Sequence, residues 1–239
     1  MPVDFTTRST SEELMDDLSC EGEVVDQTLR ELDFINQWLG GNQITARALK
    51  ESWKSIPKTH VITIADLGCG SGEMLRIISK LASDENRSVK LIGFDANPQI
   101  VNYAQAHSTA YSDISFEALN VFSKEFQNQQ FDFVLATLFM HHFSKEELIQ
   151  LLKSLQKQTR YSIIINDIHR HPLAYYSIKW LTLFFSKSAM VKFDAPLSVL
   201  RSFKRFEWEE IMVSISQSDY LLSWKWAFRW KLVMRMKEL

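Results

Sequence analysis

The sequence has very few cysteines, since among its 239 residues only Cys20 and Cys69 carry a thiol. Two thiols are too few for a disulfide framework or a zinc site built from thiolates, so we expect a cytoplasmic protein in a reducing compartment. The sequence also lacks long runs of like charge, and its formal net charge is -2. The chain as a whole therefore has no electrostatic attraction to nucleic acid, and we expect no nucleic-acid partner.

Segments of the kind that enter or cross a membrane are also missing. Residues 1–17 are acidic and polar, unlike a signal peptide. The most apolar stretch, residues 173–191, is interrupted by Lys179 and Lys187 and is barely long enough to span a bilayer, so we expect no transmembrane segment and a buried or lid helix there. With 46% hydrophobic and 23% charged residues the composition is globular, and it predicts a single domain over residues 1–239.

Short β-branched or apolar runs alternate with amphipathic segments through the middle of the sequence. The expected strands are residues 61–65, 89–94, 114–119, 131–136 and 161–166. The expected helices are residues 74–81, 98–107 and 145–156. This alternation is typical of βαβ units, and it predicts an α/β fold with a mostly parallel sheet that has helices on both faces.

The flanking segments have different patterns. Residues 1–56 are expected to form N-terminal helices, at 9–18, 28–39 and 44–53, ahead of a core over 57–167. Residues 168–206 are rich in aromatic side chains and look like a helical lid inserted after the fifth strand. In 207–239, a helix at 208–216 precedes an alternation of apolar and basic residues from Trp224 to Met236, which predicts two antiparallel strands. The sheet would then have seven strands, and its basic face would either contact an anion or, as is more common, be solvated on an edge strand.

A glycine-rich loop follows the first expected strand. Gly68, Gly70 and Gly72 permit a tight turn and close approach of the backbone to a ligand. Asp66 places a carboxylate where a dinucleotide pyrophosphate would have to lie, and Glu73 stands where the dinucleotide motif has Gly or Ala. These acids favour a cationic ligand over NAD, and the absence of a following Lys-Ser or Lys-Thr excludes a phosphate-binding P-loop.

A second acid, Asp95, ends the second strand in the sequence Gly-Phe-Asp, where a carboxylate can accept both hydroxyls of a ribose. Together, Asp-Leu-Gly-Cys-Gly-Ser-Gly-Glu and Gly-Phe-Asp resemble motifs I and II of the class I S-adenosylmethionine-dependent methyltransferases. The strand order and lengths agree with that family from Val61 through Asn166. The resemblance implies a Rossmann-like fold, S-adenosylmethionine as cofactor and S-adenosylhomocysteine as product.

The resemblance also implies roles for individual residues. Asp66 would lie near the methionine ammonium, the loop glycines would pass beneath the cofactor, and Asp95 would hold the ribose. Asn120 stands where the family commonly has an Asp that binds the adenine amino group, and an amide oxygen can accept the same bond. The expected cofactor-binding residues are Asp66, Gly68, Cys69, Gly70, Gly72, Asp95, Ala96, Asn120, Val121 and Thr137.

Histidines are the candidate proton acceptors, because methyl transfer to an acidic O–H needs a base whose pKa lies near neutrality. His141 and His142 follow the fourth strand, where they either act on substrate or only pack locally. Asp167 and His169 lie two residues apart at the end of the fifth strand, and they form either an orienting acid and a base or a structural anchor for the lid.

The acceptor is expected to be a small molecule. Residues 165–176, the aromatic insert and a late Trp-Ala-Phe-Arg-Trp resemble bacterial methyltransferases that accompany polyketide and quinone-type biosynthesis, which implies a flat, apolar, phenolic acceptor methylated at oxygen or carbon. The aromatic residues after the fifth strand then serve either as core or as a substrate wall. The sequence has no His-x-x-x-His spacing and no acid ending the fourth strand, so we expect no metal ion.

Two other functions remain open at this point. The first is methylation of protein or RNA, which would need an open cleft in place of a lid. The Asn-Pro-Pro-Tyr motif of nucleic-acid amine methyltransferases is replaced by Ala-Thr-Leu-Phe, which argues against that substrate class. The second is binding of S-adenosylmethionine without catalysis. The sequence does not predict the oligomeric state.

Overall fold

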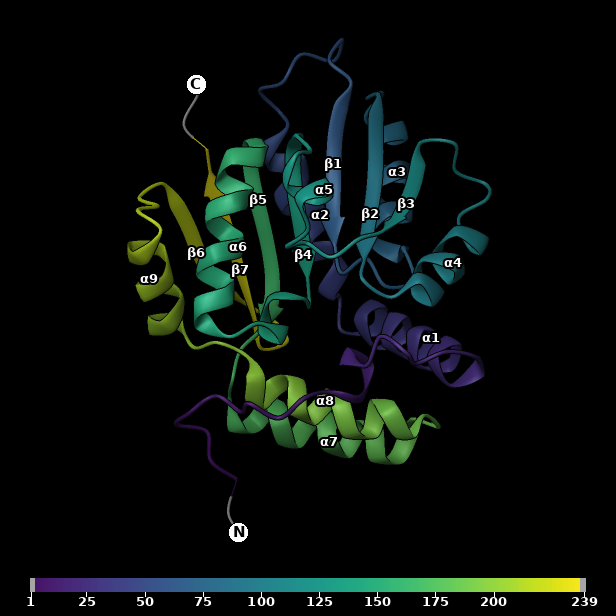
Figure 1. Cartoon of the computed structure of the whole chain (residues 1–239), viewed down its shortest axis with the longest axis vertical. Helices are drawn as coiled ribbons and strands as arrows, with labels where there is room; N and C mark the ends of the chain where they lie inside the picture. The colour runs from purple at the N-terminus through teal and green to yellow at the C-terminus, as the bar shows by residue number, and fades with distance from the viewer. Residues whose placement is uncertain (1–2, 237–239) are drawn as a thin grey trace.

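A computed structural model describes residues 3–236, so the first two and last three residues of the expected domain lie outside the description. Its centre is a seven-stranded sheet in the order β3-β2-β1-β4-β5-β7-β6 (Figure 1). The strands are β1 Ile62–Leu67, β2 Val89–Asp95, β3 Ile114–Ala118, β4 Phe131–Thr137, β5 Thr159–Ile168, β6 Tyr220–Lys225 and β7 Arg229–Arg235. β1 to β5 are mutually parallel, and β7 is antiparallel to both of its neighbours. The predicted Rossmann-like sheet is confirmed.

Helices cover both faces of the sheet because the strands alternate the faces to which their side chains point. In β4, Phe133 and Leu135 join one buried cluster, and Val134 and Ala136 join the other. The first cluster packs under α3 and α4, together with α2 (Gly41–Ser52) of the N-terminal segment. The second packs under α5, α6 and α9. The bounds are α3 Glu73–Asp84, α4 Pro98–Ala106, α5 Lys124–Gln127, α6 Lys145–Gln158 and α9 Arg205–Ser214.

The N-terminal segment differs from the prediction in its first part. Helices α1 (Glu23–Trp38) and α2 (Gly41–Ser52) form as expected, but residues 9–18 are extended apart from one 3-10 turn, Leu14–Asp16. The backbone N–H groups of Leu14 and Met15 donate to the carboxylate of Asp194, at 2.8 and 3.1 Å, and so do not take part in a helix. We call residues 8–18 the strap.

The segment after β5 forms two helices, α7 (Pro172–Phe185) and α8 (Ala189–Arg201). They lie together as a separate layer at the bottom of Figure 1, across the edge at which the parallel strands end. The strap runs along the same layer (Figure 1). No helix within residues 3–236 is both long enough and apolar enough to cross a membrane.

The C-terminal strands form the predicted antiparallel pair, and the turn comprises residues 226–228. This turn contains no Gly, Pro or Asn, and its residue with a positive φ, of +54°, is Phe228. The prediction of a solvated basic face is wrong for Arg229, which is buried. β7 lies between β5 and β6, so the edge strand is β6. The guanidinium of Arg229 reaches α1 and donates to Asn36 Oδ1 at 2.7 Å.

Candidate functional site

A cavity of about 1560 Å³ lies at the carboxyl edge of the parallel strands. The loops after β1, β2 and β4 form one side, and α7, α8 and the strap form the other. The strand order reverses between β1 and β4, which is where open α/β sheets bind ligands. The volume exceeds the upper range of about 1,000 Å³ for a pocket that holds one drug-sized ligand. The cavity therefore has room for a cofactor and a second molecule.

The glycine loop follows β1 and forms part of the cavity wall through Gly68, Cys69 and Gly70. A Cβ on Gly68 would lie 2.3 Å from the ring of Phe139, and the φ of this residue is +61°. Only glycine fits this close approach of the loop to the segment after β4. Gly72 does not line the cavity; it begins α3 with a φ of +77°.

Two carboxyl groups flank the glycine loop. Asp66 in β1 faces the cavity and is only 2% exposed. Burial, and then the negative charge of Asp95, raise the pKa of Asp66 to about 8, and no hydrogen bond opposes them. Asp95 at the end of β2 accepts the N–H groups of Gly70 and Asn97, at 3.3 and 3.0 Å. Burial raises the pKa of Asp95 despite these bonds. Asp66 is thus an unpaired acid suited to a cationic group.

Residues of α1 and α2 complete this end of the cavity. Glu73, which the sequence singled out, accepts hydrogen bonds from Gln37 and from Asn42 Nδ2, the latter at 2.5 Å. Asp33 accepts the hydroxyl of Ser71 at 2.8 Å, and burial raises the pKa of Asp33 to about 6. Sequence reasoning missed Asp33 and Asn42 because these contacts join residues more than thirty positions apart and no motif marks them.

The other residues predicted to bind the cofactor also line the cavity, namely Ala96, Asn120, Val121 and Thr137. Asn120 Oδ1 accepts the N–H of Phe122 at 2.8 Å, which leaves one oxygen lone pair and the amide hydrogens for a ligand. The hydroxyls of Thr137 and Thr45 lie 2.9 Å apart, and this contact holds α2 against the end of β4.

His141 and Asp167 form a buried pair, and His141 lines the cavity. Because β4 and β5 are parallel neighbours, the residues that follow one strand meet the end of the other. Asp167 accepts the ring N–H of His141 at Nδ1 (2.7 Å) and the backbone N–H of His141 (3.0 Å). Burial tends to raise the pKa of Asp167, but the charge and hydrogen bond of His141 outweigh it and lower that pKa. His141 Nε2 then remains free as a proton acceptor.

The predicted pairing of Asp167 with His169 is wrong. His169 does not line the cavity; its ring lies 4.9 Å from that of Trp230 and 5.4 Å from that of His171. Burial, and then the charges of His171, Lys204 and Arg170, lower the pKa of His169 to about 4, so the ring is neutral at pH 7. The spacing of two residues predicts that Asp167 and His169 lie on one side of the strand. In the structure His141, which follows β4, occupies the space beside Asp167.

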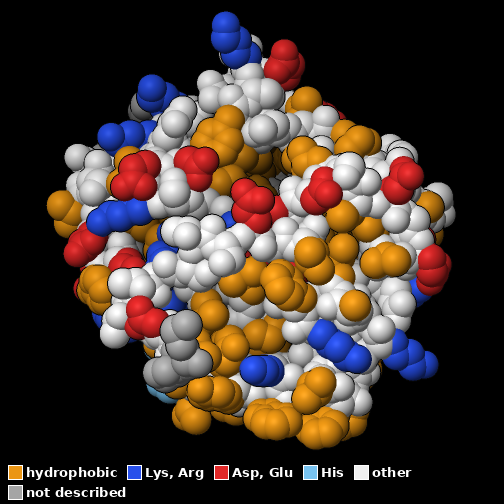
Figure 2. All heavy atoms as spheres, turned by 60° about the horizontal axis from the view of Figure 1, so that its bottom comes forward, with side chains coloured by type: hydrophobic (Ala, Val, Ile, Leu, Met, Phe, Trp, Pro, Cys, Tyr) orange, Lys and Arg blue, Asp and Glu red, His pale blue; other side chains and the backbone are white. Residues whose placement is uncertain are grey.

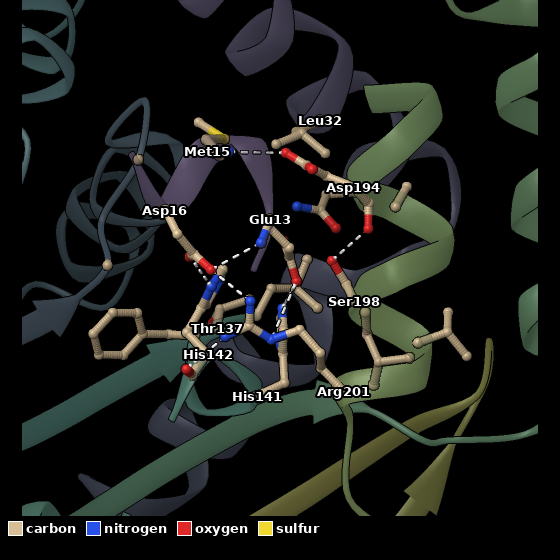
Figure 3. Close-up of a pocket in the computed structure, with 18 of the residues that line it drawn as sticks. Glu13, Met15, Asp16, Leu32, Thr137, His141, His142, Asp194, Ser198 and Arg201 are labelled. Carbon is tan, nitrogen blue, oxygen red and sulfur yellow. Dashed lines mark hydrogen bonds and ion pairs between the residues drawn. The ribbon is translucent and has the colours of Figure 1, made fainter. Parts of the chain in front are cut away.

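The strap supplies acids that the sequence analysis did not assign (Figure 3). Glu13 Oε1 lies 3.6 Å from His141 Nε2 and 3.9 Å from Arg201 Nε, and it has no hydrogen-bond partner. Burial raises the pKa of Glu13 to about 7. Asp16 accepts from His142 Nδ1 at 2.7 Å and pairs with Arg201. Residues 9–18 were expected to form a helix, and that prediction gave Glu13 and Asp16 no contact with the cavity.

The same cluster has the ligand types of a metal site. Ligand atoms of Glu13, His141 and His142 lie within 4.8 Å of one another. However, Arg201 lies beside Glu13 and also pairs with Asp16, so a guanidinium cation already opposes these carboxylates. A divalent ion at this position would face a fixed positive charge at short range.

The aromatic residues of the lid are not the wall of the cavity. α7 lines the cavity with Ala174, Ser177, Ile178 and Leu181. Trp180 and Phe184 lie on the opposite side of the helix, where they are exposed. The core alternative holds for Tyr175 and Phe203, which are buried, but neither core nor substrate wall holds for Trp180 and Phe184. The period of the helix places the cavity-lining residues and the exposed aromatic residues on different faces of α7. Aromatic composition alone does not predict which of these faces is covered.

Known proteins resemble parts of this chain. Residues 64–162 match a family model described as a methyltransferase domain. A tRNA U34 carboxymethyltransferase of Aliarcobacter butzleri (strain RM4018) is 29% identical over 148 residues, which cover 57% of this chain and 45% of the relative. The chain thus spans less than half the length of this curated relative.

Solved structures share the fold. Human N-acetylserotonin methyltransferase in complex with S-adenosylmethionine superposes with a TM-score of 0.66 at 17% identity, over 95% of this chain and 60% of that one. The plantazolicin methyltransferase BpumL in complex with S-adenosylhomocysteine has a TM-score of 0.63 at 17% identity, over 89% of each chain. Residues 64–162 of this chain therefore resemble a methyltransferase domain, and the chain shares its fold with methyltransferases solved with S-adenosylmethionine or S-adenosylhomocysteine bound.

The residues that surround this part of the cavity fit S-adenosylmethionine. Asp66 offers an unpaired buried carboxyl for a cationic ammonium, and Gly70, where an added Cβ would meet only Leu29 at 3.8 Å, leaves the loop backbone open to a ligand. Asp95 lies beside this turn, where its oxygens can accept ribose hydroxyls.

Proposed function

We propose that this protein transfers the methyl group of S-adenosylmethionine to a small, apolar acceptor with an ionisable O–H or ring C–H, such as a phenol or quinol. The observation that carries the proposal is the His141–Asp167 pair, which places a free imidazole nitrogen at the acceptor end of a cavity with room for both molecules. We assign Asp66, Asp95, Gly68, Gly70, Asn120 and Thr137 to the cofactor.

The chemistry asks the protein to hold the acceptor in line with the methyl group and to take up one proton. S-adenosylmethionine supplies the methyl group on a sulfonium centre, which leaves as a neutral thioether. The acceptor loses its proton to His141 Nε2, and Asp167 holds the ring and stabilises the imidazolium that forms. Asp167 is thus a positioning residue, and Glu13 faces the same nitrogen from the strap.

An acceptor of small size agrees with the surroundings of this nitrogen. Ala174, Ile178 and Leu181 of α7 present an apolar wall, and the strap lies across the cavity beside them. Such a lid excludes water and a large polymer alike. Both cysteines carry free thiols, and we place the reaction in the cytoplasm.

A screen of phenols and quinols with labelled cofactor would test the proposal. His141→Ala and Asp167→Asn should each lower kcat by about 10²- to 10⁴-fold, the usual contribution of a general base, with little change in cofactor affinity. Added imidazole should restore part of the activity of His141→Ala. The matched control is His169→Gln, which lies outside the cavity and should keep full activity. Equal losses in all three variants would disprove the assignment.

We also propose that the reaction needs no metal ion, because Arg201 occupies the position opposite Glu13 and Asp16. Turnover should be unchanged after treatment with EDTA and removal of the chelator. Loss of turnover, with recovery on adding one particular divalent ion, would instead assign Glu13, His141 and His142 as its ligands.

The curated tRNA relative favours one other function, methyl or carboxymethyl transfer to RNA. The charges of the cavity argue against it, because eleven Asp and Glu residues line it against four Lys and Arg. Phosphate groups would be repelled by such a surface. We expect no shift of bulk tRNA in a gel at physiological salt, and transfer of label to tRNA in preference to phenols would replace our proposal with this one.

A further inference from the structure

The outer face of α7 is an unusually apolar surface. Leu173, Tyr176, Trp180, Leu183 and Phe184 are exposed and recur at helical spacing, so they form one stripe along the helix. Phe185, which is 81% exposed, extends it at the end of the helix, and Phe193 of α8 adds a further exposed ring. Figure 2 shows this region as the mostly hydrophobic lower part of the molecule. We call these seven residues the α7 face.

The α7 face is separate from the proposed active site. The opposite side of the same helix lines the cavity with Ala174, Ile178 and Leu181. The rings of Trp180 and Phe184 stack on each other with centroids 5.8 Å apart and stay open to solvent. Contiguous exposed apolar patches on soluble proteins commonly mark a site of contact with another surface.

The charged side chains that residues 172–193 add to the α7 face are all lysines. Lys179, Lys187 and Lys192 are exposed, and the sequence from Pro172 to Phe193 contains no acid. The next acid along the chain, Asp194, is buried and turned inward, where it accepts the N–H groups of Leu14 and Met15. Glu31 of α1 lies nearby, and its carboxylate accepts the N–H groups of Lys187 and Ser188.

This combination of aromatic side chains and lysines identifies the partner. Trp and Tyr rings suit the boundary between lipid tails and headgroups, and lysines add attraction to anionic headgroups. A second copy of the chain, docked face to face, would bring the same lysines together and gain no opposite charge. With fourteen residues α7 is too short to cross a bilayer, but it can lie in the plane of its surface.

We propose that the α7 face binds the surface of a lipid bilayer that carries anionic headgroups. α7 would lie parallel to the membrane, with its aromatic side chains among the lipid headgroups and its other face toward the cavity. Binding of this kind is peripheral and depends on ionic strength. It does not rest on the proposed acceptor, because it can be measured without turnover.

Co-sedimentation with extruded vesicles tests the proposal. The full chain should sediment with equimolar phosphatidylcholine and phosphatidylglycerol, bind phosphatidylcholine alone much more weakly, and dissociate at high salt. The double variant Trp180→Ser/Phe184→Ser should lose about tenfold or more in affinity, since both rings leave the interface. Replacing all three lysines by Gln should weaken binding by about fivefold per lysine, and only to the anionic vesicles.

The matched control is Val213→Ser/Leu221→Ser, which removes two exposed apolar side chains from α9 and β6, outside the α7 face. It should bind as the wild type does. All replaced side chains are exposed, so folding should be kept, and unchanged binding of S-adenosylhomocysteine would verify this. Absence of vesicle binding by the wild type overturns the proposal. So does equal weakening by the control, or a dimer that only Trp180→Ser/Phe184→Ser dissociates.

Discussion

At the scale of single residues, the protonation of Asp66 should couple the affinity for the cofactor to pH. Its ordinary pKa of 3.8 is raised to about 8 in the folded protein, so at pH 7 the carboxyl is mostly protonated before a ligand binds. A cationic ammonium would favour the ionised form. Binding should therefore release a proton, and affinity should rise as the pH increases from about 6 to about 8.

Asp66→Asn tests this coupling. The variant should bind S-adenosylmethionine about 10- to 100-fold more weakly, as for loss of a bond of about 1.5–3 kcal/mol to a charged group, and should lose the pH dependence. Calorimetry in buffers of different ionisation enthalpy measures the released proton directly. Proton release by the variant equal to that of the wild type would assign the proton to another group, such as Asp95, whose pKa is also raised.

The same raised pKa affects stability with a definite sign. Between the ordinary pKa of 3.8 and about 8, the unfolded chain has lost a proton from Asp66 that the folded protein keeps. The contribution of Asp66 to the free energy of unfolding therefore falls as the pH rises through this window. The ligand-free Asp66→Asn variant should be the more stable protein at pH 8 in urea denaturation. A less stable variant would contradict this sign.

Gly68 offers a second test at this scale. Alanine there should cost about 1–2 kcal/mol for the left-handed backbone, and more because its Cβ would meet the ring of Phe139. Cofactor affinity should fall with it. Gly40→Ala is the matched control, since its φ of +68° is similar but nothing lies within 4 Å of the added Cβ. Equal unfolding free energies and equal cofactor affinities for the two variants would show that contact with Phe139 does not matter.

The sequence predicted those site residues that belong to a local motif. Asp66 and Asp95 lie at the carboxyl ends of β1 and β2 and Gly68 directly follows β1, and parallel topology brings these strand ends to one edge. The sequence could not predict that Asp167 would pair with His141 instead of His169, because the choice depends on how two neighbouring strands are placed side by side. Glu13 was missed for a stronger reason, as it reaches the cavity from more than a hundred residues away in the chain.

At the scale of elements, the strap is held to the lid mainly by polar contacts. Asp194 binds two backbone N–H groups of the strap, and Arg8 donates to the carbonyl oxygens of Arg201, His141 and Phe143. Two of the strap's apolar side chains, Leu14 and Leu18, are exposed, so little apolar burial supports it. Elements held in this way open more readily than the core.

Asp194→Ala should therefore loosen the strap without unfolding the protein. We expect faster amide exchange at Leu14 and Met15 and a higher KM for the acceptor, with cofactor affinity nearly unchanged. Asp17→Ala is the matched control, because Asp17 is exposed and accepts only from Ser19. If Asp17→Ala raised KM equally, the effect would come from lost negative charge in general.

The elements predicted well were those whose apolar pattern is repeated and bounded. β1 and β2 are buried strands between turn residues, and their positions were correct to within two residues. Residues 9–18 were assigned to a helix because spaced apolar and acidic residues fit that period, but long-range bonds to Asp194 and Arg201 decide their conformation. For β7, the alternation of apolar and basic residues correctly predicted a strand. The pattern did not predict that this strand lies between β5 and β6.

At the scale of the whole molecule, the two buried clusters pack on opposite faces of the same strands, and these strands end at the cavity. Ligand binding in the cavity should therefore stabilise the whole domain in one cooperative transition. At 100 times its Kd, S-adenosylhomocysteine should add about 2.7 kcal/mol to the free energy of unfolding, and raise Tm by about 5–10 °C in a single transition. NAD is the control and should give no shift, because Glu73 stands where the dinucleotide motif has Gly or Ala. Equal shifts with both would contradict the specificity of the loop.

The position of the described chain ends has a practical consequence. Val3 and Phe5 pack with Tyr175 against the lid, a few residues before the strap, whereas β7 ends at Arg235 at the other end of the sheet (Figure 1). A folded fusion partner or purification tag attached before Val3 should weaken the packing of Val3 and Phe5, and with it the contacts that hold Glu13 near His141. One attached after Arg235 would leave them alone, so the terminus chosen for a tag should itself alter the measured kinetics.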